Sequence, residues 1–189
     1  MRIIGGEYKG RKLAEFAGES VRPTSDRARE ALFNIFAYRI HGARVLDLFC
    51  GSGALGIESL SRGAREVTFN DISKDSLAIL KKNLSALKIS LGERAKLFNY
   101  DFATCLECVK GEFDFIFLDP PYKMDYGKKA LEKIVQNGLL SENGVAVLER
   151  DEPFKETLLG LEKFDERRYG KAHFTFFKKA KTEQNGDEA

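Results

Sequence analysis

Apolar and polar positions along this chain form two kinds of segment that alternate. Short apolar runs rich in branched and aromatic side chains occur five times, at residues 44–49, 66–70, 95–100, 113–118 and 144–148. Helix-like segments lie between and after them, at residues 54–62, 74–87, 102–109 and 126–136. Strands that alternate with helices at this spacing predict an α/β fold with a doubly wound, mostly parallel sheet, which is a Rossmann-like architecture.

The N-terminal end of the chain adds elements of a different kind. Residues 2–13 combine two short β-like pieces with glycines and charges, and they predict a small hairpin or flap. Residues 27–38 predict a helix. Its buried face is expected to carry Ala28, Leu32, Ile35 and Phe36.

The C-terminal end predicts a second hairpin, formed by residues 162–169 and 173–178, that closes one edge of the sheet. We expect a single domain over residues 1–180. It would divide into a hairpin-and-helix extension at 1–40 and a sheet core at 41–180. Residues 181–189 are polar, and we expect a disordered tail there.

The most informative stretch is Asp119-Pro120-Pro121-Tyr122, which directly follows an apolar run. Two consecutive prolines cannot continue a central strand, because each lacks the backbone N–H that the ladder needs. The chain must therefore leave the sheet at Asp119 and present a carboxylate, two carbonyls and a ring at the carboxyl edge, where open α/β sheets bind ligands. This set suits a flat base with an amino group, although a proline-rich turn capped by aspartate would contain the same residues.

An aspartate lies at or just after the end of each of the first four core strands. These residues are Asp47, Asp71, Asp101 and Asp119. One such aspartate is common, because aspartate caps helices and favours turns. Parallel strands would bring all four to the same edge of the sheet, and four in register are more than capping predicts.

The first strand-to-helix turn reads GSGALG, from Gly51 to Gly56, and satisfies the GxGxxG nucleotide fingerprint. Asp71 also lies at about the position that a ribose-binding acid takes in a NAD site. Charge argues against NAD, because Asp47 and Asp119 would repel a pyrophosphate placed over this turn. A ligand with adenosine, no phosphate and a cationic chain fits better, and S-adenosylmethionine has these properties.

Net charge is only +2, so composition alone does not indicate a nucleic-acid-binding protein. The charge is uneven, however: residues 1–44 contain nine Lys or Arg and five Asp or Glu, and the rest of the chain has a small acidic excess. Phosphates would therefore bind at the N-terminal segment. The candidate contacts are Lys9, Arg11, Lys12 and Arg22.

Cysteine usage indicates neither disulfides nor metal. Cys50, Cys105 and Cys108 are an odd number, and the CxxC that the last two form has no second pair to complete a zinc site. We expect no metal, and we interpret the CxxC as small residues on one helix face. No apolar run reaches the length of a membrane span and no secretory signal is seen, so we expect a cytoplasmic protein without a membrane partner.

Several of these motifs occur in the order typical of Rossmann-like, class I methyltransferases: VLDLFCGSGALGIES, Asn70-Asp71, Asp101-Phe102 and DPPY. Together with RIIGGEYKGRKL and the narrower RPTSDRAREALFNIF, they make the chain resemble the RsmD family of 16S ribosomal RNA guanine-N2 methyltransferases. The resemblance extends to about Lys179. One departure is Asp71, where glutamate is more usual; aspartate keeps the charge but shortens the reach.

The resemblance implies S-adenosylmethionine as cofactor, held in three places. Asp71 would bind the ribose hydroxyls, Gly51 and Gly53 the methionine part, and Asp101 the adenine amino group. Asp47, Cys50 and Phe102 would complete the cofactor site, although Cys50 also suits a small packing position.

The resemblance also implies a catalytic set at Asp119, Pro120, Pro121 and Tyr122. The exocyclic amine of guanine is a weak nucleophile and must be held in line with the methyl group. Asp119 and the Pro120 carbonyl would accept its two N–H groups, and Tyr122 would stack on a base that has left its helix. The expected substrate is 16S ribosomal RNA, in an assembly intermediate of the small subunit.

Three other functions use some of the same residues. An amino-group methyltransferase acting on adenine N6 of DNA, or on another RNA, is compatible with DPPY. A NAD-dependent oxidoreductase is compatible with the glycine fingerprint, and a non-catalytic RNA-binding module is compatible with the fold.

Overall fold

The computed structural model describes residues 1–16, 26–121 and 125–181. Seven strands form one sheet in the order β3-β2-β1-β4-β5-β7-β6. The strands are β1 (Arg44–Asp47), β2 (Glu66–Asn70), β3 (Ala95–Phe98), β4 (Phe113–Leu118), β5 (Leu140–Arg150), β6 (Leu161–Tyr169) and β7 (Ala172–Lys179). The helices are α1 (Asp26–Ile35), α2 (Ala54–Ser61), α3 (Lys74–Ala86), α4 (Phe102–Cys108) and α5 (Tyr126–Gln136).

The first five strands are parallel, and β7 and β6 add antiparallel at one edge. The predicted doubly wound, mostly parallel sheet is therefore confirmed, as is the late hairpin. Strand order reverses between β1 and β4, because the chain builds outward from β1 to β3 and then returns to β4. In such sheets the crevice at the carboxyl ends of these two strands is the ligand site.

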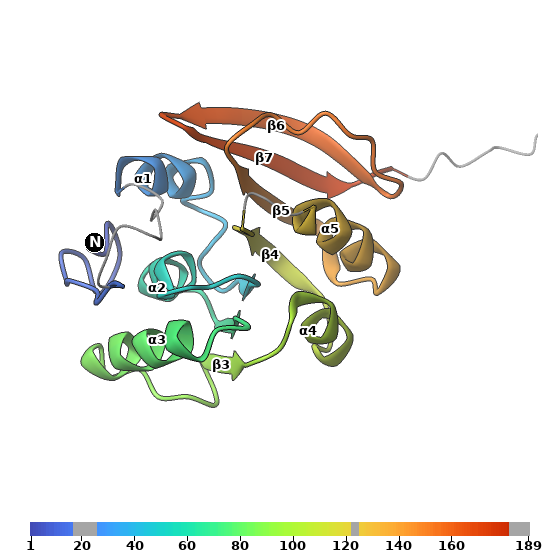
Figure 1. The fold of residues 1–189 in the computed structure, drawn as a ribbon. Coiled ribbons are helices and arrows are strands. Elements are labelled where there is room, and N and C mark those ends of the chain that lie inside the picture. Colours follow the sequence, from blue (N-terminus) through green and yellow to red (C-terminus); the bar gives the residue numbers. More distant parts are fainter. Residues whose placement is uncertain (17–25, 122–124, 182–189) are drawn as a thin grey trace, which may run out of the picture.

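Helices cover both faces of the sheet (Figure 1). The face that includes Val45, Phe117 and Val147 packs against α1, α2 and α3. The opposite face, which includes Leu46, Ile116 and Leu148, packs against α4 and α5. Because side chains alternate along a strand, every second residue of β1, β4 and β5 belongs to the same layer.

Helix α1 differs in one respect from the prediction. Phe33 is fully buried, whereas Ile35 is 40% exposed. Phe33 lies against Phe117, with ring centroids 5.7 Å apart, so the buried face is centred on Leu32 and Phe33. The expectation that Ile35 would be buried was wrong, because it lies outside the arc of the helix that the sheet covers.

Strand β5 begins four residues earlier than predicted, at Leu140. Residues 141–143 are polar and precede Gly144, which made them look like a turn. They nevertheless belong to β5, where the pairing with β4 is irregular. Phe113 pairs with Leu140 but Phe115 pairs with Val145, so the register shifts between the two pairs.

The N-terminal arm, residues 1–16, forms the expected hairpin-like structure. Arg2 and Lys12 are bridged antiparallel, and the Ile3 N–H donates to the Arg11 carbonyl at 3.0 Å. The arm lies beside α1 and α2 in Figure 1. Glu58 of α2 accepts the backbone N–H groups of Ile4 and Gly5 at 2.8 and 2.9 Å, so a buried carboxylate anchors the arm to the core.

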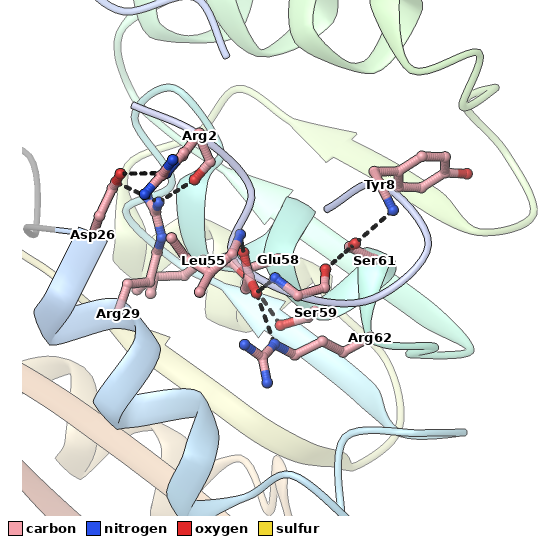
Figure 2. A network of polar contacts seen from close by, with 11 residues as sticks. Arg2, Tyr8, Asp26, Arg29, Leu55, Glu58, Ser59, Ser61 and Arg62 are labelled. Atoms are coloured by element: carbon pink, nitrogen blue, oxygen red, sulfur yellow. Dashed lines mark hydrogen bonds and ion pairs between the residues drawn. The ribbon is translucent and has the colours of Figure 1, made fainter. Parts of the chain in front are cut away.

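Figure 2 shows a wider network around this anchor. Arg62 also donates to Glu58, at 2.7 Å, and Ser61 accepts the Tyr8 N–H at 3.0 Å. On the α1 side, buried Arg29 donates to the Arg2 carbonyl and pairs with Asp26. The arm is therefore tied to two helices that cover the same face of the sheet.

The predicted tail lies almost wholly outside the described residues, because the last of these is residue 181. The division into one domain and a tail therefore stays a prediction. No helix in the described part of the chain is long and apolar enough to cross a membrane.

Candidate active site

The carboxyl ends of β1, β2, β3 and β4 carry the four predicted aspartates. Asp47 is the last residue of β1, Asp71 and Asp119 directly follow β2 and β4, and Asp101 lies three residues after β3. They differ strongly in surroundings, because Asp47 is buried, Asp71 and Asp119 are partly buried and Asp101 is exposed. Solvent exposure along this edge therefore increases from the centre, at β1 and β4, to the side at β3.

The glycine turn, residues 51–53, is held by Asp71. The Gly51 N–H donates to Asp71 Oδ2 at 2.8 Å, and the Ser73 N–H donates to Oδ1 at 2.8 Å. Gly51 has a φ of +52°, and a Cβ added there would meet no atom within 4 Å. Open space thus lies directly beside the backbone of this turn, which is what a ligand that approaches it needs.

Gly53 serves a different purpose. Its φ is +86°, and an added Cβ would lie 2.4 Å from Leu80 Cδ1. The backbone of Gly53 thus passes close to the buried Leu80 of α3, and Gly53 is the N-cap of α2, in a left-handed conformation. Of the first two fingerprint glycines, Gly51 lies beside open space and Gly53 lies against the packed side chain of Leu80.

Asp47 lies beneath the turn. Its Oδ2 accepts the Gly56 N–H at 2.9 Å, in the first turn of α2. Burial raises the pKa of Asp47 to about 7, the Gly56 hydrogen bond opposes that rise, and the nearby Asp71 charge adds to it. A cation placed next to this carboxyl would favour its ionised form.

Asp119 is the second carboxyl at the switch point. Burial raises its pKa well above the usual range for aspartate, and the carboxyls of Glu149 and Asp47 raise it further. Pro120 is buried and Pro121 exposed. The chain leaves the sheet at this point, as predicted, because β4 ends at Leu118. Tyr122 lies outside the described residues.

Glu149 near the end of β5 belongs to the same group, and sequence reasoning missed it. Its side chain is only 3% exposed. Asp47, Asp119 and Glu149 each lie two residues beyond a core residue of the same sheet face, namely Val45, Phe117 and Val147. This period-two relation could have identified Glu149, but a charged residue after an apolar run resembles an ordinary solvent-exposed strand end.

The open side of the edge combines a capping aspartate with exposed apolar groups. Asp101 caps α4, accepting the N–H groups of Ala103 and Thr104 at 3.0 Å. The hydrogen bond from the Thr104 hydroxyl, followed by these backbone bonds, lowers the pKa of Asp101. Ile72, next to Asp71, is 72% exposed, and Tyr100 is 41% exposed. These groups suit a flat ring that lies between the carboxylates of Asp71 and Asp101 and contacts Ile72 and Tyr100.

Phe102, Cys50 and Cys105 make packing contacts in this structure, whereas Cys108 is exposed. The Phe102 ring lies 5.8 Å from that of Phe49 and 5.1 Å from that of Tyr126, so it anchors the start of α4. Cys50 and Cys105 are buried, and burial raises the pKa of Cys105 to about 12. Within the described ranges, no three His, Cys, Asp or Glu side chains are placed to hold a metal ion together.

Strand ends at the site are braced by two side-chain amides that were not predicted, the buried Asn70 and the exposed Asn99. Asn70 donates to the carbonyls of Leu48 and Tyr100, both at 3.1 Å, and accepts the Tyr100 N–H at 3.2 Å. Asn99 donates to the Asp71 and Ile72 carbonyls at 2.8 and 3.0 Å. These bonds link the segments after β1, β2 and β3 and hold the edge in shape.

The predicted phosphate contacts on the arm are exposed: Lys9, Arg11 and Lys12. The Arg11 guanidinium donates to the Ala86 carbonyl at the end of α3, at 2.6 Å, which fixes its direction. Arg22 lies outside the described residues. The structure therefore gathers three of the four predicted cations on one element.

Comparison with known proteins identifies relatives of this chain. Residues 1–178 match the family model described as Conserved hypothetical protein 95. The chain is 40% identical to Ribosomal RNA small subunit methyltransferase D of Haemophilus influenzae over 157 residues, covering 81% of each protein. It is 36% identical to the Escherichia coli protein of that name over 151 residues, covering 80% of this chain and 75% of the other.

The fold is shared as well as the sequence. The solved structure of yhhF from Escherichia coli superposes with a TM-score of 0.83 at 32% identity, over 95% of this chain and 97% of that one. The chain belongs to the family of Ribosomal RNA small subunit methyltransferase D, the family that the model Conserved hypothetical protein 95 describes.

Proposed function

We propose that this protein transfers a methyl group from S-adenosylmethionine to the exocyclic N2 amine of a guanine in 16S ribosomal RNA. The observation that carries the proposal is the gathering of Asp47, Asp119 and Glu149 at the switch point, beside a glycine turn that faces open space. Three neighbouring carboxyls favour a cation, whereas the pyrophosphate of NAD would be repelled. The names of the relatives support ribosomal RNA of the small subunit as the substrate class.

The residues of the site fit S-adenosylmethionine in three parts. Asp71 would accept the ribose hydroxyls while it holds the glycine turn, and the open space beside Gly51 would take the methionine part. Asp101 would bind adenine, together with the exposed side chains of Ile72 and Tyr100, which follow β2 and β3. When bound, S-adenosylmethionine supplies a methyl group on a positively charged sulfur.

The chain's own residues position the nucleophile and take up charge. Asp119 would accept one N–H of the guanine amine and the Pro120 carbonyl the other, which directs the nitrogen lone pair toward the donor. The ionised carboxylate would stabilise the positive charge that develops on the amine nitrogen and offer an oxygen for the proton that nitrogen loses. Tyr122 would stack on the base.

Substrate binding would use the N-terminal arm. Lys9, Arg11 and Lys12 are exposed on an element anchored to α2, the helix that follows the glycine turn, and they would contact phosphates. We propose a partly assembled small subunit in the cytoplasm as the substrate. Its target base would have to leave its helix to reach a partly buried carboxyl.

The test is methyl transfer from labelled S-adenosylmethionine to small ribosomal subunits from cells that lack this protein, followed by nucleoside analysis. We expect label in N2-methylguanosine of 16S ribosomal RNA and none in DNA. Label in N6-methyladenosine or in DNA would instead support the rival amino-group methyltransferase, and no transfer to any nucleic acid would reject the proposal.

A further inference from the structure

Asn83 of α3 contacts both the N-terminal arm and the glycine turn. Its side chain is buried, with 2% exposed. Oδ1 accepts the Ala14 N–H at 2.7 Å, and Nδ2 donates to the Ala14 carbonyl at 3.1 Å. The same Nδ2 donates to the Ser52 carbonyl at 2.9 Å. One amide thus joins the last part of the arm to the centre of the turn.

The chemistry of the position demands a carboxamide. Ala14 presents a donor and an acceptor, and Ser52 presents another acceptor, so the partner must accept once and donate twice. Asparagine does this with one planar group. A carboxylate at this position would accept but not donate, and an apolar side chain would leave three partly buried backbone groups without these partners.

The other anchors of the arm hold it to helices and not to the turn. Glu58 contacts Ile4 and Gly5, and Ser61 contacts Tyr8 and Gly5 (Figure 2). These contacts involve the middle and end of α2. Asn83 differs because a single side chain contacts both Ser52 of the turn and Ala14 of the arm.

We propose that Asn83 is a positioning residue that couples cofactor binding to the ordering of the arm, and through the arm to RNA binding. A ligand bound on the glycine turn restricts the motion of Ser52. The hydrogen bond that Asn83 donates to the Ser52 carbonyl then restricts the amide, and the amide restricts the motion of Ala14. The arm then has less freedom to lose when RNA binds. Thermodynamic reciprocity requires that RNA raise cofactor affinity by the same factor. The RNA part of this inference rests on the proposed function.

The first test needs no RNA. Hydrogen exchange of the Ala14 N–H is followed with and without S-adenosylhomocysteine in the wild type, in Asn83→Leu and in Ser61→Ala. Ser61→Ala is the matched control, because it removes arm contacts that do not touch the turn. We expect S-adenosylhomocysteine to slow Ala14 exchange about tenfold in the wild type and in Ser61→Ala, and to have no such effect in Asn83→Leu.

The second test measures RNA affinity with and without S-adenosylhomocysteine, using unmodified small subunits. We expect about five- to tenfold tighter binding with the cofactor product in the wild type, and a ratio near one in Asn83→Leu. If S-adenosylhomocysteine binds the wild type and Ala14 exchange is unchanged, the coupling is overturned whether or not the variants fold. If S-adenosylhomocysteine fails to bind at all, the proposed function fails instead.

Discussion

Glu149 raises the pKa of Asp119, and the two carboxyls follow adjacent, register-matched positions of β4 and β5. Leu118 pairs with Leu148, and each carboxyl belongs to the next residue. Neighbouring carboxyls in a buried setting cannot both ionise readily. Burial is the largest cause of the raised pKa of Asp119, and Glu149, on a different strand, raises that pKa further and so shifts the pH at which Asp119 can accept a proton.

The acid limb of the activity should report this pair. If Asp119 acts ionised, kcat/KM falls as pH drops through its raised pKa, well above the pH at which an ordinary aspartate titrates. Glu149→Gln removes the repelling charge and should move the limb to lower pH, whereas Glu149→Asp should move it less. A pH–rate profile that is the same in Glu149→Gln and the wild type would contradict this coupling.

Asp119 itself should be required for transfer and not for folding. Asp119→Asn keeps the size of the side chain and one acceptor oxygen but removes the charge that stabilises the developing cation. We expect kcat to fall about 10²- to 10³-fold while the Kd of S-adenosylhomocysteine changes little. Single-turnover transfer and calorimetric binding measure the two quantities, and full activity of Asp119→Asn would reject the assigned role.

The charge of ionised Asp47 should lower the stability of the folded protein and strengthen cofactor binding. Its pKa is about 7 in the folded protein against 3.8 normally, so the folded state binds this proton more tightly than the unfolded chain does. The stability it contributes is thus present below about pH 4 and is lost as pH rises toward 7. Asp47→Asn should therefore become more stable relative to the wild type, by about 2–4 kcal/mol between pH 4 and pH 8.

Chemical denaturation of both proteins across that pH range measures the difference. Binding of S-adenosylmethionine to Asp47→Asn should be weaker, because a negative charge near a cation is gone. Parallel stability curves for the two proteins would show that Asp47 does not titrate as its burial indicates.

The two glycines of the turn should separate folding from binding. Gly53→Ala combines a positive φ with a Cβ 2.4 Å from Leu80, and we expect a loss of about 2–4 kcal/mol in the free energy of unfolding. Gly51→Ala faces open space, so only the backbone strain of about 1–2 kcal/mol applies. The main effect of Gly51→Ala should be weaker S-adenosylhomocysteine binding, which calorimetry on the folded variant measures. Equal losses of stability in Gly51→Ala and Gly53→Ala would contradict this division.

The arm should contribute salt-dependent RNA binding. Lys9→Ala and Lys12→Ala each remove one exposed cation, and each should lower the slope of log affinity against log salt by about one. Lys110→Ala, after α4 on the other face of the sheet, is the matched control and should leave the slope unchanged. Slopes that do not differ among the three variants would remove the arm from the RNA interface.

Much of this fold was predictable because its signals are local. Alternating strands and helices identified the doubly wound sheet, and the two prolines after Asp119 identified the end of β4. Glu149 and Asn83 were missed because their burial depends on neighbouring elements that sequence order does not reveal. Ile35 and the start of β5 were misjudged where a helical face or a polar strand segment is decided by what packs against it.

The most direct test of the acidic crevice is a crystal structure with S-adenosylhomocysteine. We predict that adenosine lies between Asp71 and Asp101, that the homocysteine crosses the open side of Gly51, and that the sulfur faces Asp119. Adenosine bound elsewhere, or a sulfur that points away from Asp119, would contradict the account.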